Sequence, residues 1–140
     1  MKTARVLRAL GLGLLLMGAR PVDAAFDPQA PFSTTNGASI PVTGVAARST
    51  SSIFGGISLW NDHGATEYLM IFNTTTQPTN GTAPLWVVQC AATQLCNTTT
   101  PIPEGGIVMP NGIFLIFSTT PTTLTAIGSA SAGWYVVAYR

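Results

Sequence analysis

The sequence predicts an all-β protein, built as a single antiparallel β-sandwich or jelly roll of about eight strands. Three observations support this fold class. Short runs rich in β-branched and aromatic residues recur along the chain. Clusters of glycine, proline, asparagine and aspartate separate these runs at short intervals. No helix of useful length fits between them, and a small closed barrel is the alternative architecture for strands at this spacing.

An N-terminal signal helix is expected over residues 1–24. A basic start is followed by an apolar run at residues 9–17 and by small residues at positions 22 and 24. This order is typical of a secretory signal peptide that is cleaved after Ala24. The apolar run is shorter than the about 20 residues that cross a bilayer, so no membrane span is expected after cleavage. The predicted location is secreted, periplasmic or at the cell surface, and a bacterial source is favoured.

An extended arm is predicted over residues 25–41, because three prolines and an Asn-Gly pair interrupt any periodicity there. The β-sandwich domain is predicted over residues 42–140. Its strands are expected, in order, at residues 42–48, 52–60, 67–74, 85–91, 106–109, 113–119, 122–127 and 134–139.

Charged side chains are scarce in residues 25–140. Only Arg48 and Arg140 are basic there, and the acidic residues are Asp27, Asp62, Glu67 and Glu104. Binding to phosphates requires a patch of lysine and arginine, which two separated arginines do not provide. Nucleic acid is therefore not expected as a partner.

Two predicted strands are apolar on both faces, whereas a strand with one solvated face alternates apolar with polar residues. These strands are residues 113–117 and 134–139. Either the chain's own loops and arm cover the outer faces, or another subunit does. We favour assembly, because few positive charges remain to keep the sheet edges from pairing.

Cys90 and Cys96 are the only cysteines, and a close pair in an exported chain predicts one disulfide. The five residues between them can form a hairpin loop that places the cysteines opposite each other, within disulfide range. Closing this ring of seven residues is worth roughly 2.4 kcal/mol in the chain-entropy account. The setting is neither CxxC-like nor electropositive, so no redox activity is expected.

His63 is the only histidine, and it is interpreted as a solvated residue of an Asn-Asp-His-Gly turn. A hydrolytic triad would need a nucleophile elbow of the type Gly-x-Ser-x-Gly, which does not occur. A glycosidase would need two facing carboxylates, and the acidic residues are few. We expect no catalytic residue, no cofactor and no metal site, so the chain is predicted not to be an enzyme.

Four residues are candidates for binding. Trp60, Trp86 and Trp134 lie inside or at the end of predicted strands, which favours core packing for each. The alternative is that they form a stacking platform for a glycan. Leu95, in the loop between the cysteines, is the fourth candidate.

The chain resembles small all-β proteins that are encoded in the structural regions of tailed phages. The resemblance is carried by residues 68–73 (YLMIFN), 78–84 (PTNGTAP), 106–113 (GIVMPNGI) and 118–125 (STTPTTLT), and by a final aromatic strand that closes on a tyrosine. It extends over residues 42–140 and implies a β-sandwich unit of a virion, attached to a capsid or tail or exposed on its surface, without catalytic residues. The leader and the cysteine pair favour a host-surface or extracellular use of the same fold.

The sequence thus predicts an exported non-enzymatic protein that acts by assembly or adhesion. Its partner would be a second copy of the chain or another surface or particle protein. The alternative is a monomeric secreted binding module that recognises a glycan or a protein through aromatic residues or the disulfide loop. Size in solution distinguishes the two.

Overall fold

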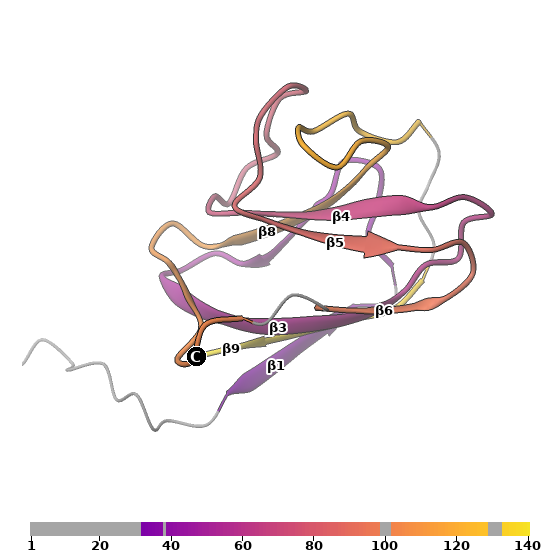
Figure 1. The fold of residues 1–140 in the computed structure, drawn as a ribbon. Helices are drawn as coiled ribbons and strands as arrows, with labels where there is room; N and C mark the ends of the chain where they lie inside the picture. Colours follow the sequence, from indigo (N-terminus) through magenta and orange to yellow (C-terminus); the bar gives the residue numbers. More distant parts are fainter. Residues whose placement is uncertain (1–31, 38, 99–101, 129–132) are drawn as a thin grey trace, which may run out of the picture.

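The computed structural model describes residues 32–37, 39–98, 102–128 and 133–140, and Figure 1 shows their strands in two layers that pack face to face. The all-β fold class is confirmed, because this part of the chain contains nine strands and no helix. Accordingly, none of these residues belongs to a helix long and apolar enough to cross a membrane. The expected signal peptide and the start of the arm lie outside the described residues.

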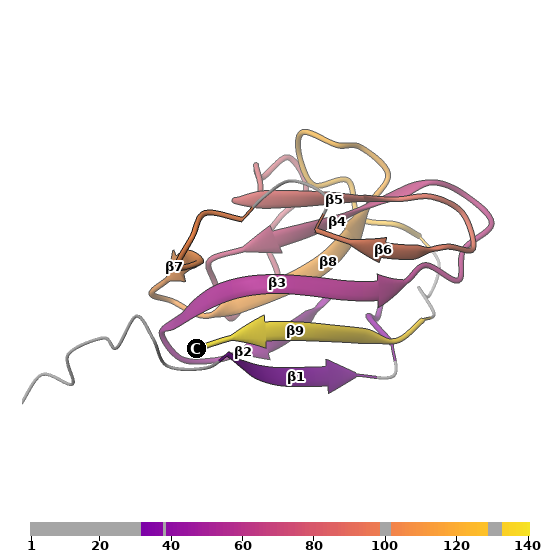
Figure 2. The same ribbon diagram turned by 60° about the horizontal axis from the view of Figure 1, so that its bottom comes forward.

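The first layer, sheet A, is antiparallel and has the strand order β1-β9-β3-β6. The short strand β7 pairs with the beginning of β3, and Figure 2 shows these strands side by side. The bounds are β1 (Ser33–Gly37), β3 (Ser52–Trp60), β6 (Leu95–Asn97), β7 (Ile107–Met109) and β9 (Tyr135–Tyr139).

The second layer, sheet B, is also antiparallel and has the order β2-β8-β4-β5. Its strands are β2 (Val45–Arg48), β4 (Glu67–Phe72), β5 (Trp86–Cys90) and β8 (Ile113–Ser118). Inward side chains of both sheets form the main core between the layers, and strand alternation selects them. Strand β8, for example, contributes Ile113, Leu115 and Phe117 to this core.

The outer face of sheet B carries a second apolar cluster, made of Met70, Phe72, Phe114, Ile116 and Leu124. The first four belong to β4 and β8, whereas Leu124 comes from the loop that follows β8. Backbone hydrogen bonds link Leu124 to Gly81 and Thr82 of the β4–β5 loop at 2.7 and 2.8 Å. For residues 113–117 the expectation of cover by another subunit is wrong, because the chain's own loops bury this face.

Seven of the eight predicted strands appear within a few residues of their expected bounds, and three regions differ. The expected arm contains β1, which pairs with β9. Its small polar residues form no apolar pattern from which a strand could be predicted. Strand β6 was not predicted. Residues 122–127 form only an isolated bridge between Ser118 and Ala126, because Leu124 inserts into the outer cluster of sheet B as part of a loop.

Candidate functional site

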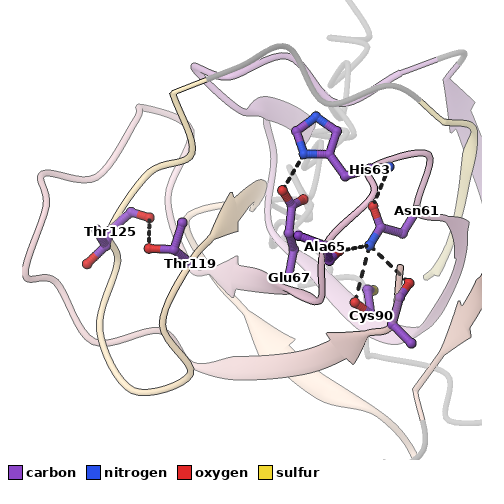
Figure 3. Close-up of polar contacts among 8 residues, drawn as sticks. Asn61, His63, Ala65, Glu67, Cys90, Thr119 and Thr125 are labelled. Carbon is purple, nitrogen blue, oxygen red and sulfur yellow. Dashed lines mark hydrogen bonds and ion pairs between the residues drawn. The ribbon is translucent and has the colours of Figure 1, made fainter. Parts of the chain in front are cut away.

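A buried asparagine organises the junction between the two sheets at the end of β3. Asn61 Nδ2 donates to the carbonyl oxygens of Ala65, Cys90 and Ala91 at 3.1, 3.2 and 3.0 Å. Asn61 Oδ1 accepts a hydrogen bond from the backbone N–H of His63 at 3.0 Å, as Figure 3 shows. One side chain therefore fixes both the β3–β4 turn and the end of β5. The Asn-Asp-His-Gly pattern predicted the turn, but it did not predict that the asparagine would be buried.

His63 Nδ1 lies 2.5 Å from Glu67 Oε1, and Figure 3 shows the two side chains pointing toward each other. The interpretation of His63 as a solvated turn residue is wrong, since its side chain is mostly buried and paired. Glu67 is 4% exposed because it occupies an inward position of β4, in register with Cys90. Its second oxygen, Oε2, is buried without a hydrogen-bond partner in the described part of the chain. The alternation Glu67, Leu69, Ile71 could have revealed this buried carboxylate.

The cysteines do not face each other across a hairpin, and that part of the prediction is wrong. Cys90 ends β5 in sheet B, whereas Cys96 lies in β6 of sheet A, opposite Leu59. The intervening turn crosses between the layers because the β3–β4 turn holds it. Asn61 N–H donates to Gln94 O at 2.9 Å, and Thr93 N–H donates to His63 O at 3.0 Å.

Both cysteines are free thiols in this structure and both are buried. Cys90 Sγ donates to Val88 O at 3.8 Å, and Cys96 Sγ donates to Gln94 O at 3.5 Å. Burial raises the pKa of the Cys90 thiol, and the neighbouring Cys96 thiol raises it further. Burial also raises the pKa of Cys96. A raised pKa keeps a thiol protonated and weakly nucleophilic, which is the opposite of an activated catalytic cysteine.

Chemically, this junction suits structure better than catalysis. The described residues contain no group of three or more histidine, cysteine or acidic side chains that could hold a metal ion. A histidine–carboxylate pair supplies two of the three members of a catalytic triad, and the third would be a nucleophile. The thiols nearest to Glu67 are those of Cys90 and Cys96, and burial keeps both protonated and weakly nucleophilic.

The outer face of sheet A differs from that of sheet B because small and polar side chains occupy most of it. Strand register places its outward residues in four rows that run across the strands. In order along the strands these rows are Trp134, Trp60 and Leu95; Asn36, Val136, Ser58 and Asn97; Thr34, Ala138, Gly56 and Thr98; and Phe32, Arg140 and Gly55.

The first row, which we call the Trp row, brings together three of the four candidate binding residues. Trp60 N–H donates to Trp134 O at 3.0 Å, and Leu95 is the register partner of Trp60 on its other side. Trp60, Trp134 and Leu95 are 37%, 47% and 51% exposed. The favoured role of core packing is therefore wrong for Trp60 and Trp134. Trp86 lies apart on β5, partly buried against the main core.

Two shallow hollows lie next to the Trp row. One, of about 460 Å³, is lined by Asn36, Trp134 and Val136 among others. The other, of about 370 Å³, lies over Gly56, Ser58 and Asn97. They are neighbours because both include Val136, and they exist because the second and third rows carry short side chains.

A further hollow of about 510 Å³ lies at the β4–β5 loop and includes Thr76, Pro78 and Leu85. It contains no titratable side chain, and one loop with its flanking residues forms it. The Trp row, formed by residues of β3 and β6 and by the residue directly before β9, is the better-defined candidate site.

Comparison with known proteins gives no match: no protein-family model, no curated protein and no solved structure shows significant similarity to this chain.

Proposed function

We propose that this chain is an exported, non-enzymatic β-sandwich protein that acts by adhesion through the outer face of sheet A, as a cell-surface or phage-like virion subunit. The observation that carries the proposal is the Trp row. Large apolar side chains exposed together on a rigid surface are typical of contact sites, and tryptophan is enriched among the residues that dominate binding energy.

The contrast between the sheets supports this choice of surface. The chain's own loops bury the apolar outer face of sheet B, so that face needs no partner. Trp60, Trp134 and Leu95 are exposed, whereas the inward side chains beside them, such as Leu59 and Cys96, are buried in the main core. Their backbone lies in β3 and β6 or directly before β9, and an ordered backbone lowers the entropy cost of binding.

Self-association through the same face is the second candidate, because exposed tryptophans lie beside a hollow over Gly56 and Ser58. Two copies related by a two-fold axis would each insert the Trp row into the hollow of the other. Light scattering of the mature protein tests this arrangement. A molecular mass that rises with concentration supports it, and a monomer at all concentrations excludes it.

The adhesion proposal is tested by co-sedimentation with washed cells of the producing organism. The double variant Trp60→Ser/Trp134→Ser should lose binding and keep its fold, because both side chains are exposed. Leu85→Ala is the matched control, since Leu85 is a similarly exposed apolar residue away from this face. Undiminished binding by the double variant would refute adhesion through this surface.

A further inference from the structure

We infer that the ligand of this surface is a neutral polysaccharide whose sugar rings stack on Trp60 and Trp134. The inference rests on the proposed function and specifies its partner. A sugar ring presents C–H groups on one face and hydroxyls at its edge, so it needs an aromatic surface with uncharged hydrogen-bonding groups beside it.

The aromatic part is the Trp row at one end of the outer face of sheet A. The two tryptophans sit on neighbouring strand positions and each exposes more than a third of its surface. The six residue steps from Trp134, directly before β9, to Arg140, directly after it, cover about 20 Å at the usual rise of a strand. At the far end Phe32 lies over Gly55, with the Arg140 guanidinium 4.7 Å from its ring centroid. Between these ends the surface is low, which leaves room for an extended chain of sugars.

The polar part consists of amides and hydroxyls in the rows next to the tryptophans. No hydrogen bond within the described residues uses the side chains of Asn36, Ser58 or Asn97. An amide offers both donors and acceptors, and a hydroxyl can do either. These groups therefore suit sugar hydroxyls, which also donate and accept.

Charge favours a neutral sugar. The outward residues of the first three rows are all uncharged, and Arg140 enters only at the far end, where it stacks on Phe32. An anionic polysaccharide would find no row of cations to neutralise it.

Area argues against a second copy of the chain as the main occupant. A tryptophan that is wholly covered buries up to about 250 Å². The two partly exposed rings therefore offer about 200 Å² of apolar surface, whereas a stable interface buries about 800 Å² of total surface on each partner, more than half of it apolar. The rows beside them carry small or polar side chains, so they add little apolar area. A few stacked sugar rings match this smaller surface.

The first experiment uses purified mature protein and named probes: cellulose, chitin and mannan as neutral polysaccharides, and alginate as the acidic one. We expect binding to at least one neutral polysaccharide and weaker or no binding to alginate. Trp60→Ala and Trp134→Ala should each weaken binding by roughly tenfold or more, as expected for residues that dominate a contact. Asn97→Ala should weaken it by a smaller factor, and Leu85→Ala should leave it unchanged.

The second experiment separates the sugar from other receptors on the cell. Periodate cleaves the vicinal diols of sugars such as those of cellulose and mannan, whereas chitin has no such diol in its chain and is degraded by chitinase instead. Cells treated with both reagents should no longer bind the protein, whereas protease-treated cells should still bind it. Binding that survives both periodate and chitinase, or preference for alginate over every neutral polysaccharide, overturns the sugar assignment while leaving adhesion intact. Failure to bind cells and all four polysaccharides overturns both proposals. Unchanged binding by both tryptophan variants also overturns them.

Discussion

The outer faces of the two sheets limit their exposed apolar surface in opposite ways. Sheet B carries large apolar side chains such as Phe114 and Ile116, and two long loops fold over them. Sheet A carries mostly short or polar side chains on its outer face, and it leaves the Trp row exposed. Figure 1 shows the difference directly, because the loops rise on the side of β4 and β8 and not beneath β3 and β9.

This contrast explains why the Trp row is unusual. A strand that is apolar on both faces does not reveal whether the chain itself or a partner supplies the cover. In sheet B the loops after β4 and β8 supply it. In sheet A the small outward residues need no cover, and the large apolar residues of the Trp row lie exposed among them, outside the main core.

Removing part of the loop cover on sheet B should have the largest effect on stability. Leu124→Ala should lower the free energy of unfolding by about 2–5 kcal/mol, because Leu124 is buried and its loss leaves a cavity over β4 and β8. The matched change on sheet A, Val136→Ala, should cost less than about 1 kcal/mol, since a surface substitution removes little packing. Urea denaturation of both variants measures the two values, and equal losses would contradict the distinction between the faces.

Much of the fold could be predicted from the sequence, because strand periodicity and turn residues are local signals. Strand β3 appears with the expected bounds, and β4, β5 and β8 shift by one or two residues. What could not be predicted depends on contacts between distant segments. Strand β1 is recognisable only through β9, and Leu124 belongs to a cluster rather than to a strand.

The candidate site was predictable only in its parts. Trp60, Trp134 and Leu95 stood out as residues, but the sequence favoured the core for both tryptophans. Their common row depends on β6 leaving the expected hairpin and pairing with β3 in sheet A. Asn61 directs that crossing through hydrogen bonds to residues about thirty positions away, a relation that no local pattern contains.

A disulfide between the two cysteines should stabilise sheet A more than the loops that cover sheet B. We predict that Cys90 and Cys96 form a disulfide after export, and that it joins the two sheets where β6 enters the Trp row. Reduction should cost roughly 2.4 kcal/mol of stability and leave the fold intact. Hydrogen exchange should rise in β6 more than in β8. Intact-mass analysis of freshly exported protein checks the bond, and two alkylatable thiols without reduction would refute it.

The pH dependence of stability tests the same bond independently. In the reduced protein, burial raises the pKa of both thiols, so the folded state keeps its thiol protons at a pH where the unfolded chain loses them. The stabilisation is complete below the ordinary thiol pKa of about 8.5 and declines as pH rises above it. The oxidised protein has no such thiols and should lack this decline. Burial also raises the pKa of Tyr135, which adds a later decline in both forms.

The smallest effect is expected at the junction of the sheets, where His63 pairs with Glu67. His63→Ala should lower stability by about 1–2 kcal/mol, because it leaves the buried carboxylate of Glu67 without its partner, although water can reach the vacated place. Adding Glu67→Gln should recover part of that loss by removing the unpaired charge. Adhesion should be unchanged in both variants, since neither residue lies on the outer face of sheet A. Loss of binding without loss of stability would instead make this pair part of the functional site.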